Sequence, residues 1–314
     1  MNNKLEKNKI CIFGSSGMLG TYLVKKLKKK GFKNLSLPKK KELNLLNENK
    51  IHKYLKKKRP DIIINLAAKN AGALQIQKNK FEYLYENSKM FQNSIYASYK
   101  NNTSIFLNIS SASAYPDNNI RNKEKDILSG KLEKASEPYG ISKIHGIKLV
   151  EYLNKTKNNF FSLVLPNIYG PKPLNKDNFQ FIDLFIRKFI NEININVVLN
   201  KKLKREFLYI EDACDVIIFF LNKALNNKIY NHTINIQPSI NIQLIKVIKL
   251  ISNLTKNKSY KIINDEKIIN STKMLDYSIL KKYSWRPKIK FAEGLKKTVK
   301  YYKKNNIKNK NSAI

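Results

Sequence analysis

Three side chains in the middle of the sequence have the types and spacing needed for acid–base chemistry at a carbonyl group. Tyr139 and Lys143, in YGISK, are four residues apart and so lie on one face of a predicted helix. A lysine ammonium beside a phenol favours the phenolate, so we expect the pKa of Tyr139 to fall toward the working range. Ser111 ends the apolar run before this helix, and its hydroxyl could donate to a substrate oxygen. Together they predict proton transfer at a carbonyl or alcohol while a nicotinamide carries hydride.

Such chemistry needs a bound nicotinamide cofactor, and the N-terminal region carries a motif for one. The run GSSGMLG follows an apolar segment and precedes a helical pattern. Glycines allow a tight turn and let backbone N–H groups approach a pyrophosphate, which the N-terminus of the helix then faces. The alternative is an ordinary turn between a strand and a helix. The residues that we expect to contact the cofactor here are Gly14, Ser15, Ser16, Gly17, Met18, Leu19 and Gly20.

The segment after the second apolar run bears on which nicotinamide is used. Dinucleotide folds that prefer NAD usually place an acidic residue there for the ribose hydroxyls. Here the chain continues through Pro38 into Lys39, Lys40 and Lys41. A cation at this point suits the 2′-phosphate of NADP, and we expect Lys40 to contact the cofactor. The general abundance of lysine is the other explanation, so the sequence predicts NADP and leaves NAD possible.

The elements that must hold these motifs together follow a regular rhythm in the first half of the chain. The strands are continuously apolar, as expected for strands covered on both faces, and they alternate with helices. We therefore predict an α/β fold, with a Rossmann-like doubly wound parallel sheet and a smaller C-terminal α/β substrate lobe. Strands are expected at 9–13, 34–37, 61–67, 104–110 and 160–166, and helices at 18–30, 48–58, 81–100 and 138–157.

The rhythm becomes less regular after residue 166, which suggests a division of the chain. Residues 1–166 are predicted to form the NAD(P)-binding Rossmann domain, and 167–303 mainly the substrate-binding lobe. Segments around 205–236 are expected to return to the Rossmann domain, and 304–314 to be a disordered tail. The further expected elements are helices at 178–190, 242–255 and 291–303, and a short strand or loop leading into a helix over 205–221.

The strong positive charge raises the possibility of a nucleic-acid partner. Lys and Arg number 61 against 23 Asp and Glu, a net charge of +38, but only five of the 61 are arginine. Arginine is the residue usually recruited for bidentate contacts to bases and phosphates. The lysines are also spread along the chain, so we expect no nucleic-acid partner. A non-catalytic dinucleotide- or RNA-binding protein is kept as a second alternative, and the charge should attract anionic substrates such as nucleotide diphosphates.

Cysteine usage and hydropathy limit the location and exclude some site types. Cys11 and Cys214 make neither a disulfide framework nor a CxxC metal site, so no metal is expected. The N-terminus has no signal-peptide core, and apolar runs such as 216–221 are too short to span a bilayer. We expect a cytoplasmic protein with no membrane partner.

Taken together, these motifs resemble the extended branch of the short-chain dehydrogenase/reductase superfamily, which contains nucleotide-sugar epimerases, dehydratases and reductases. Within that branch the GDP-L-fucose synthase family is the most similar, and the resemblance runs from residue 14 to about 289. It implies an NAD(P)-dependent enzyme that acts on a nucleotide-activated sugar as a homodimer. The segments that carry it are GSSGMLG, ELNLL, NLAAKNAGA, SEPYGISKIHGIKLVE, NIYGP, REFLYIEDA and KMLDYSILKKYSWRPKI.

The resemblance also implies roles for individual residues. Ser111, Tyr139 and Lys143 would be the catalytic triad, with the last two also binding the cofactor. Other cofactor contacts would be Asn44 and Leu45 near the adenine, Ala67, Ala68 and Lys69 along the cleft, and Asn167 near the nicotinamide or the sugar. The implied substrate contacts are Ser113, Asn167, Gln180, Lys188, Arg205 and Lys273. Of these, Arg205 and Lys273 would meet the diphosphate or the nucleotide, although Arg205 could instead be a surface arginine.

Two positions depart from the pattern of that family. Ser113 stands where the family has a cysteine, and Gln180 stands at or near a family histidine. In the family this cysteine–histidine pair carries the acid–base steps of epimerisation. A serine hydroxyl ionises far more weakly than a thiol, and glutamine does not titrate. We therefore expect reduction of the C4 ketone of a nucleotide-activated 4-keto sugar, with epimerisation doubtful.

A nucleotide-sugar 4-epimerase with bound NAD is the first alternative, because it would use the same three catalytic residues. A dehydratase is disfavoured, because the residues after Ser111 do not include the acid–base carboxylates that it would need.

Overall fold

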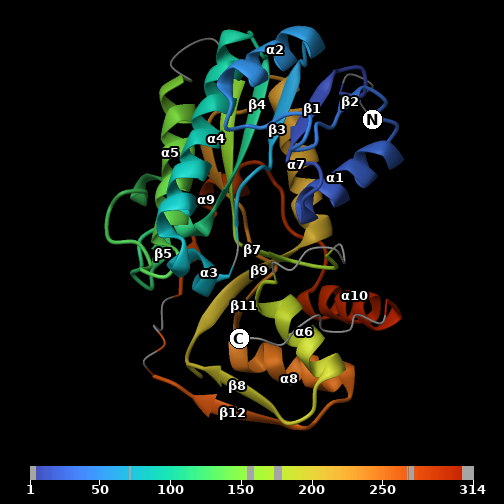
Figure 1. The fold of residues 1–314 in the computed structure, drawn as a ribbon, viewed down its shortest axis with the longest axis vertical. Helices are drawn as coiled ribbons and strands as arrows, with labels where there is room; N and C mark the ends of the chain where they lie inside the picture. The colour runs from blue at the N-terminus through green and yellow to red at the C-terminus, as the bar shows by residue number, and fades with distance from the viewer. Residues whose placement is uncertain are drawn as a thin grey trace.

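The structure is a computed structural model that describes residues 5–70, 72–153, 159–172, 179–266, 268 and 272–305. Its main body is a six-stranded sheet in the order β10-β6-β4-β3-β1-β2, with every neighbouring pair parallel (Figure 1). The strands are β1 Ile10–Phe13, β2 Leu35–Ser36, β3 Ile62–Asn65, β4 Ile105–Ser111, β6 Asn159–Leu165 and β10 Thr233–Asn235. The chain runs outward from β1 to β2 and then returns to β3 on the other side of β1. In open sheets of this kind, ligands bind at the carboxyl ends of the strands where the strand order reverses, which here are those of β1 and β3.

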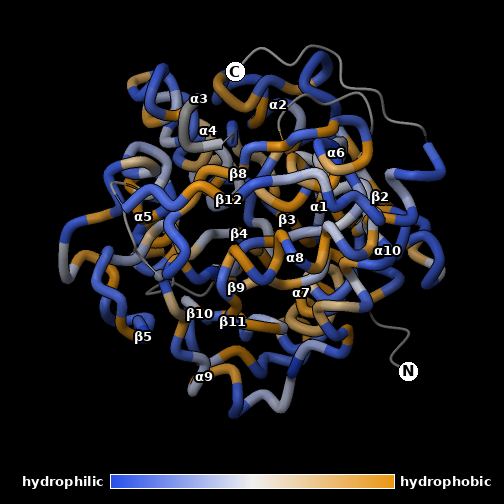
Figure 2. The backbone as a smooth tube through the Cα atoms, turned by 90° about the horizontal axis from the view of Figure 1, so that it is seen from below, coloured by the Kyte–Doolittle hydropathy of each residue, from blue (hydrophilic) through white to orange (hydrophobic). Residues whose placement is uncertain are grey.

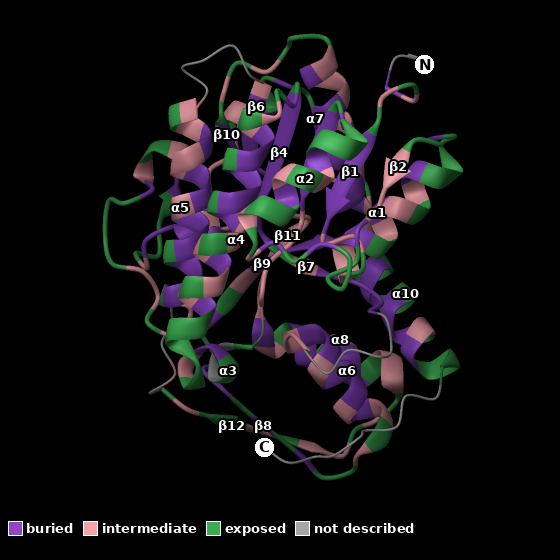
Figure 3. Ribbon diagram, turned by 45° about the horizontal axis from the view of Figure 1, so that its top comes forward, coloured by how far each residue is buried: buried purple, intermediate pink, exposed green. Residues whose placement is uncertain are grey.

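Helices cover both faces of this sheet because each strand is apolar on both sides. Ile10 and Ile12 of β1 pack into the same core cluster as α1 and α7, whereas Cys11 and Phe13 pack against α2 and α4. Figure 3 shows β1 and β4 buried, while α2 exposes one side to solvent. The helices around this sheet are α1 Met18–Lys29, α2 Glu48–Lys58, α4 Lys80–Lys100, α5 Glu137–Leu153 and α7 Ile210–Leu225.

A smaller lobe lies beyond the carboxyl ends of the main sheet and has a core of its own (Figure 1). It contains a three-stranded sheet, β11-β9-β7, and a parallel pair, β12-β8. Hydrophobic stretches lie mainly inside the molecule, and hydrophilic stretches lie around its periphery (Figure 2). The elements of the lobe are β7 Asn167–Tyr169, α6 Phe181–Asn191, β8 Ile195–Leu199, β9 Lys204–Tyr209, β11 Ile240–Gln243, α8 Leu244–Thr255, β12 Tyr260–Asn264 and α10 Phe291–Lys304.

Short elements connect the two parts. The parallel pair of β5 Arg121–Asn122 with β13 Met274–Leu275 joins the segment before α5 to the C-terminal region. The remaining short elements are α3 Ala73–Lys78, the 3-10 turns η1 Ala112–Ala114 and η2 Glu124–Asp126, and α9 Ser278–Lys281.

The predicted Rossmann-like α/β fold is confirmed, and each predicted long element is present within a few residues. The segment predicted as strand or loop before a helix is β9 followed by α7. Strands β5, β7, β8, β10, β11, β12 and β13 were not predicted, and of these β10 completes the main sheet beside β6. Helix α5 ends at Leu153, and the last residues of the helix predicted over 138–157 lie outside the described residues. Helix α10 reaches Lys304, and most of the predicted tail also lies outside the described residues.

The structure also bears on membrane-spanning helices and metal sites, neither of which the sequence predicts. In the described part of the chain, no helix combines the length and the apolar character that crossing a membrane requires. Likewise, no group of three or more His, Cys, Asp or Glu side chains in the described ranges is placed to hold a metal ion.

Candidate active site

The glycine loop is folded tightly against the end of β3. Gly14 has a φ of 77°, and a Cβ on it would lie 2.7 Å from the backbone nitrogen of Ala67. Gly20 is equally restricted, because its Cβ would lie 2.3 Å from the carbonyl oxygen of Gly14. Both positions therefore need glycine, because a side chain would clash with nearby backbone. At Gly20 the close contact packs α1 against the loop.

The N-terminus of α1 fits the pyrophosphate of a dinucleotide. Gly17 is the N-cap residue of α1, and the first turn of α1 carries no acidic side chain. Among the described residues outside its own turn, a Cβ on Gly17 would meet one atom within 4 Å, the carbonyl oxygen of Gly14 at 3.2 Å, so this side of the loop is open there. Ser15, Ser16, Met18 and Leu19 complete the same turn. Backbone N–H groups at the start of α1 can therefore approach an anion closely.

The residues expected near the adenine and the 2′-phosphate lie in the loop between β2 and α2. Lys40 and Asn44 are exposed, and Leu45 is buried. The carbonyl of Leu45 accepts a hydrogen bond from the Asn93 amide at 3.0 Å, which ties this loop to α4. The loop is therefore anchored to α4 at Leu45, and Lys40 lies on its exposed side.

The segment after β3 is held in place by α4. The backbone N–H and carbonyl of Lys69 both bond to the Asn87 amide, at 2.7 and 2.9 Å, and its Nζ pairs with Glu86 at 2.7 Å. Ala67 lies against Gly14, and Ala68 packs in a cluster with Tyr83 and Tyr139. Asn87 and Tyr83 were not predicted as part of the site. Asn87 is fully buried, but in the sequence it is one asparagine within a helical pattern, which does not by itself mark a buried hydrogen-bonding role.

Tyr139 and Lys143 lie on the buried side of α5, next to the end of β4. Their residues are 9% and 4% exposed, and α5 packs against both β4 and η1. The Lys143 Nζ donates to the carbonyl of Ile109 at 2.8 Å and lies 5.4 Å from the centre of the Tyr139 ring. Ser111 ends β4, and its Oγ accepts from the backbone N–H of Ser113 at 3.3 Å. The structure therefore brings Ser111, Tyr139 and Lys143 to one edge of the sheet.

The expected fall in the pKa of Tyr139 is wrong for this arrangement. Burial raises the pKa of Tyr139, and it lowers the pKa of Lys143 to about 7. The ammonium of Lys143 bonds to a carbonyl and lies over the tyrosine ring, so its charge does little to offset the desolvation of a phenolate. The phenol consequently keeps its proton, which is the form that donates to a carbonyl oxygen.

Ser113 lies in the turn that rests on α5. Its carbonyl oxygen would be 2.4 Å from a Cβ on Gly140, so only glycine permits this contact between η1 and the helix that carries Tyr139. The Ser113 hydroxyl is buried and has no hydrogen-bond partner among the described residues. A buried hydroxyl without a partner beside the triad is suited to contact a substrate, but not to remove a carbon-bound proton.

Gln180 and Lys188 lie at opposite ends of α6. Gln180 is the N-cap residue, half-buried, and its side chain caps no backbone N–H. The neighbouring Phe179 carbonyl would be 3.8 Å from a Cβ on Gly72, so this end of α6 approaches the segment after β3. Lys188 is eight residues further on, about 12 Å along the helix axis. These two predicted substrate contacts therefore do not share one binding point.

Asn167 begins β7 directly after β6 and points to strand β9. Its residue is exposed, and its Nδ2 donates to the Glu206 carbonyl at 3.0 Å. Asn167 thus lies between the main sheet and the lobe.

Arg205 and Lys273 converge on one carboxylate that the sequence analysis missed. Arg205 Nη2 lies 3.3 Å from Glu133 Oε1, and Lys273 Nζ lies 3.0 Å from Glu133 Oε2. Their side chains are only 24% and 10% exposed, so Arg205 is not an ordinary surface arginine. We call Glu133, Arg205, Lys273 and the nearby Asp117 the charged cluster. No local signal marks Glu133, because its partners are far away in the sequence.

Glu206 is a buried acid next to Arg205 on β9. Its Oε2 accepts from the Leu275 N–H at 3.0 Å, which holds the strand beside Lys273. Its Oε1 has no hydrogen-bond partner among the described residues, and the nearest cation, Arg121, is 3.9 Å away and half-exposed. Burial therefore raises the pKa of Glu206 to about 7.

Replacing Glu206 with Gln should stabilise the protein near pH 8 and leave it almost unchanged near pH 4. Folding raises the pKa of Glu206, so the protonated form stabilises the folded chain. This contribution is fully present below the ordinary pKa of 4.5 and is lost as the pH rises through 7. Gln stays neutral and can still accept from Leu275, so we expect a gain of about 2 kcal/mol near pH 8. Urea unfolding at pH 4 and pH 8 measures the change in the free energy of unfolding, and Glu137→Gln, at an exposed position, is the control. An equal effect at both pH values would contradict the assignment.

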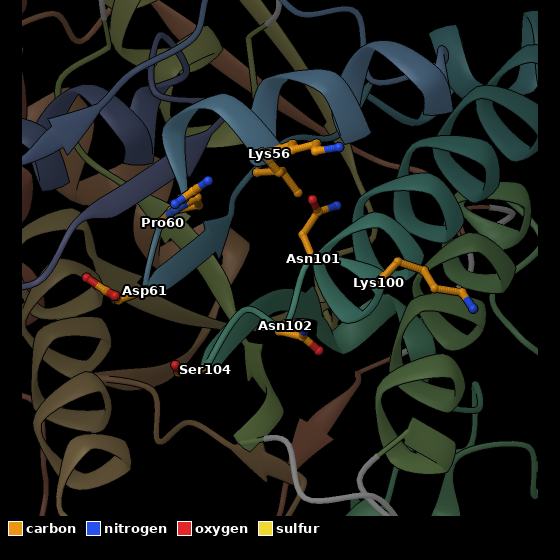
Figure 4. Close-up of a pocket in the computed structure, with 9 residues that line it drawn as sticks. Lys56, Pro60, Asp61, Lys100, Asn101, Asn102 and Ser104 are labelled. Atoms are coloured by element: carbon orange, nitrogen blue, oxygen red, sulfur yellow. The ribbon is translucent and has the colours of Figure 1, made fainter.

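A surface hollow of about 520 Å³ lies away from these residues. Figure 4 shows Asp61 and Ser104 at its rim, and these residues directly precede β3 and β4. The hollow is therefore at the amino ends of the strands, whereas the glycine loop and the triad are at the carboxyl ends. It is not part of the candidate active site.

Comparison with known proteins identifies a matching family and related sequences. Residues 10–236 match the model of the NAD dependent epimerase/dehydratase family. The chain is 29% identical over 310 residues to a GDP-L-colitose synthase of Yersinia pseudotuberculosis, covering 95% of this chain and 99% of the relative. It is 30% identical over 228 residues to the GDP-L-fucose synthase of Escherichia coli strain K12, covering 70% of this chain and 71% of the relative.

A solved structure extends the comparison to the fold and the cofactor. The structure of MlghC, a GDP-mannoheptose C4 reductase from Campylobacter jejuni with NADP bound, has a TM-score of 0.84 to this chain. The two sequences are 27% identical, and the match covers 95% of this chain and 99% of the reductase.

Proposed function

The chain belongs to the NAD dependent epimerase/dehydratase family, and on this basis we propose that it reduces the C4 ketone of a GDP-activated 4-keto sugar with NADPH. The family membership makes it an NAD(P)-dependent enzyme that acts on nucleotide sugars. The relatives named above act on GDP sugars, and one of them is a C4 reductase solved with NADP. These names support GDP as the nucleotide and NADP as the cofactor.

The observation that carries this proposal is the placement of a protonated tyrosine at the carboxyl end of β4, on the edge that also carries the glycine loop. Tyr139 is buried, and its raised pKa keeps the phenol protonated near neutral pH. The bound nicotinamide would supply hydride to C4. Tyr139 would then donate its proton to the C4 oxygen, Ser111 would orient that oxygen, and Lys143 would contact the cofactor ribose.

Ser113 and Gln180, the residues that depart from the family pattern, are poorly suited to epimerisation next to the ketone. The Ser113 hydroxyl and the Gln180 amide can donate or accept hydrogen bonds, but neither has a pKa near neutral. We infer that both contact the sugar without moving protons at C3 or C5. Asn167 and Lys188 are proposed as further substrate contacts, and Arg205 and Lys273 as the cations that meet the diphosphate.

The reaction can be tested with NADPH and a panel of GDP-, dTDP- and UDP-activated 4-keto sugars. We expect NADPH to be consumed with a GDP sugar and the product to differ from the substrate by reduction at C4. In deuterated water, the product should carry no deuterium at C3 or C5. Deuterium at both carbons would contradict the role given to Ser113 and Gln180. Interconversion of C4 epimers by retained NAD, without net use of cofactor, would instead identify a 4-epimerase.

We also propose that the protein is a cytoplasmic homodimer that pairs through α4 and α5. Phe81, Tyr85 and Tyr96 share one exposed stripe of α4, and Ile141 and Tyr152 lie eleven residues apart on α5. These side chains are between 41% and 70% exposed, and α4 packs beside α5, so the two stripes form an apolar surface suited to a second copy. Sedimentation velocity measures the mass in solution, and a single species with the mass of one chain would rule out this dimer.

A further inference from the structure

The charged cluster contains a carboxylate in the position where the proposed function needs a diphosphate. We propose that Glu133 is a resident counter-ion, which occupies the diphosphate position between Arg205 and Lys273 and which the substrate displaces when it binds. This inference rests on the proposed function, because it takes the ligand of the two cations to be a nucleotide diphosphate. It adds a residue of this chain that sets how strongly that ligand binds.

Glu133 imitates the contacts that a phosphate would make. One of its oxygens faces the Arg205 guanidinium at 3.3 Å, and the other faces the Lys273 ammonium at 3.0 Å. The second oxygen also accepts from the Ser136 hydroxyl at 3.0 Å. Carboxylate and phosphate present oxygens of similar spacing to arginine, so the two groups compete for the same donors.

Burial explains why the cluster needs a counter-ion before substrate arrives. Burial lowers the pKa values of both Arg205 and Lys273, which shows that their charges are partly removed from water. Two neighbouring desolvated cations without an anion would be strongly destabilising. Although burial acts to raise the pKa of Glu133, Lys273 and Arg205 together lower it, so the carboxylate stays ionised.

The charge balance favours exchange over addition. With Asp117 and Glu133 ionised, the charged cluster holds two positive and two negative charges. Burial raises the pKa of Asp117, and the neighbouring Glu133 raises it further, so the two acids already repel each other. A diphosphate that entered beside Glu133 would add more negative charge to a neutral cluster. One that replaced Glu133 would meet a cluster with a net charge of +1, from Arg205, Lys273 and Asp117.

The position of Glu133 places this exchange close to the catalytic tyrosine. Glu133 lies in the segment between η2 and α5, and its carbonyl accepts from the Ser136 N–H at 3.0 Å. Ser136 in turn accepts from the Gly140 N–H at 2.9 Å, in the first turn of α5. A rotation of the Glu133 side chain is enough to release both cations, and the turn that carries Tyr139 stays in place.

The test compares Glu133→Gln with the wild-type protein in binding to pyrophosphate, GDP and guanosine, by calorimetry. Removing the resident charge should tighten pyrophosphate and GDP binding by about tenfold and leave guanosine binding unchanged. Glu137→Gln, four residues along and exposed, removes the same charge outside the cluster and should change none of the three. Glu133→Ala removes the same charge and takes the place of the Gln variant if that variant does not fold.

Each other result overturns the proposal. Unchanged or weaker pyrophosphate binding in the variant would mean that Glu133 only positions the two cations. If pyrophosphate bound neither the wild-type protein nor the variants, Arg205 and Lys273 would not hold a diphosphate. Pyrophosphate binding needs no turnover and no particular base. If no 4-keto sugar is reduced, the proposed reaction fails, while the pyrophosphate result still decides the role of Glu133.

Discussion

Tyr139→Phe should reduce kcat for ketone reduction by about a thousandfold while leaving NADPH binding nearly unchanged. The phenylalanine ring keeps the packing against Ile76 and Tyr83 and the contact with the Lys143 ammonium. The substitution therefore removes the hydroxyl alone, and with it the proton that the C4 oxygen must receive. Steady-state kinetics gives kcat, and fluorescence titration gives the affinity for NADPH.

A matched variant separates the loss of the proton donor from the general loss of a hydroxyl. Tyr230→Phe makes the same chemical change on the surface between α7 and β10, where Tyr230 is 77% exposed. We expect it to retain full activity. If Tyr139→Phe turned over at the wild-type rate, the phenol would not be the proton donor and the mechanism would have to be abandoned.

Gly20→Ala should abolish measurable NADPH binding and lower the free energy of unfolding by about 3 kcal/mol. The new Cβ would lie 2.3 Å from the Gly14 carbonyl oxygen and 2.7 Å from the Ser15 carbonyl carbon. Both are backbone atoms, so relief of the clash requires α1 or the loop to move. That movement would take the N-terminus of α1 away from the pyrophosphate. Calorimetric titration with NADPH and urea unfolding measure the two effects.

Gly72→Ala is the control for a glycine replacement near the same cleft. The nearest atom to its Cβ would be the Phe179 carbonyl oxygen at 3.8 Å, an ordinary contact, and the φ of Gly72 is −65°. We expect NADPH binding and stability within the error of the wild-type values. A Gly20→Ala variant that bound NADPH normally would show that the close approach of α1 to the loop is not required.

The turn of the glycine loop and the proximity of Tyr139 and Lys143 could be predicted because their signals are local. The glycine loop comes directly between β1 and α1, and glycine is required there by contacts within a few residues and with the end of β3. Tyr139 and Lys143 share a helix face at a spacing of four residues, which any α-helix would bring together. The roles assigned to the substrate contacts remain predictions, because resemblance alone placed them.

The charged cluster could not be predicted in the same way. Glu133 pairs with residues 72 and 140 positions away, and nothing near it in the sequence marks such partners. Strand β10 was not predicted for the same reason, because it forms by pairing with the edge of β6, which is far away in the sequence.

By itself, the sequence determined the alternation of strands and helices, the glycine turn and the spacing that puts Tyr139 and Lys143 on one helix face, because periodicity and side-chain type act over short distances. The tertiary structure alone decided how those groups are charged and paired. Burial raises the pKa of Tyr139 where the sequence suggested a fall, and folding places Glu133 between Arg205 and Lys273. Desolvation and ion pairing depend on every atom that surrounds a group, and those atoms come from segments that only the folded chain brings together.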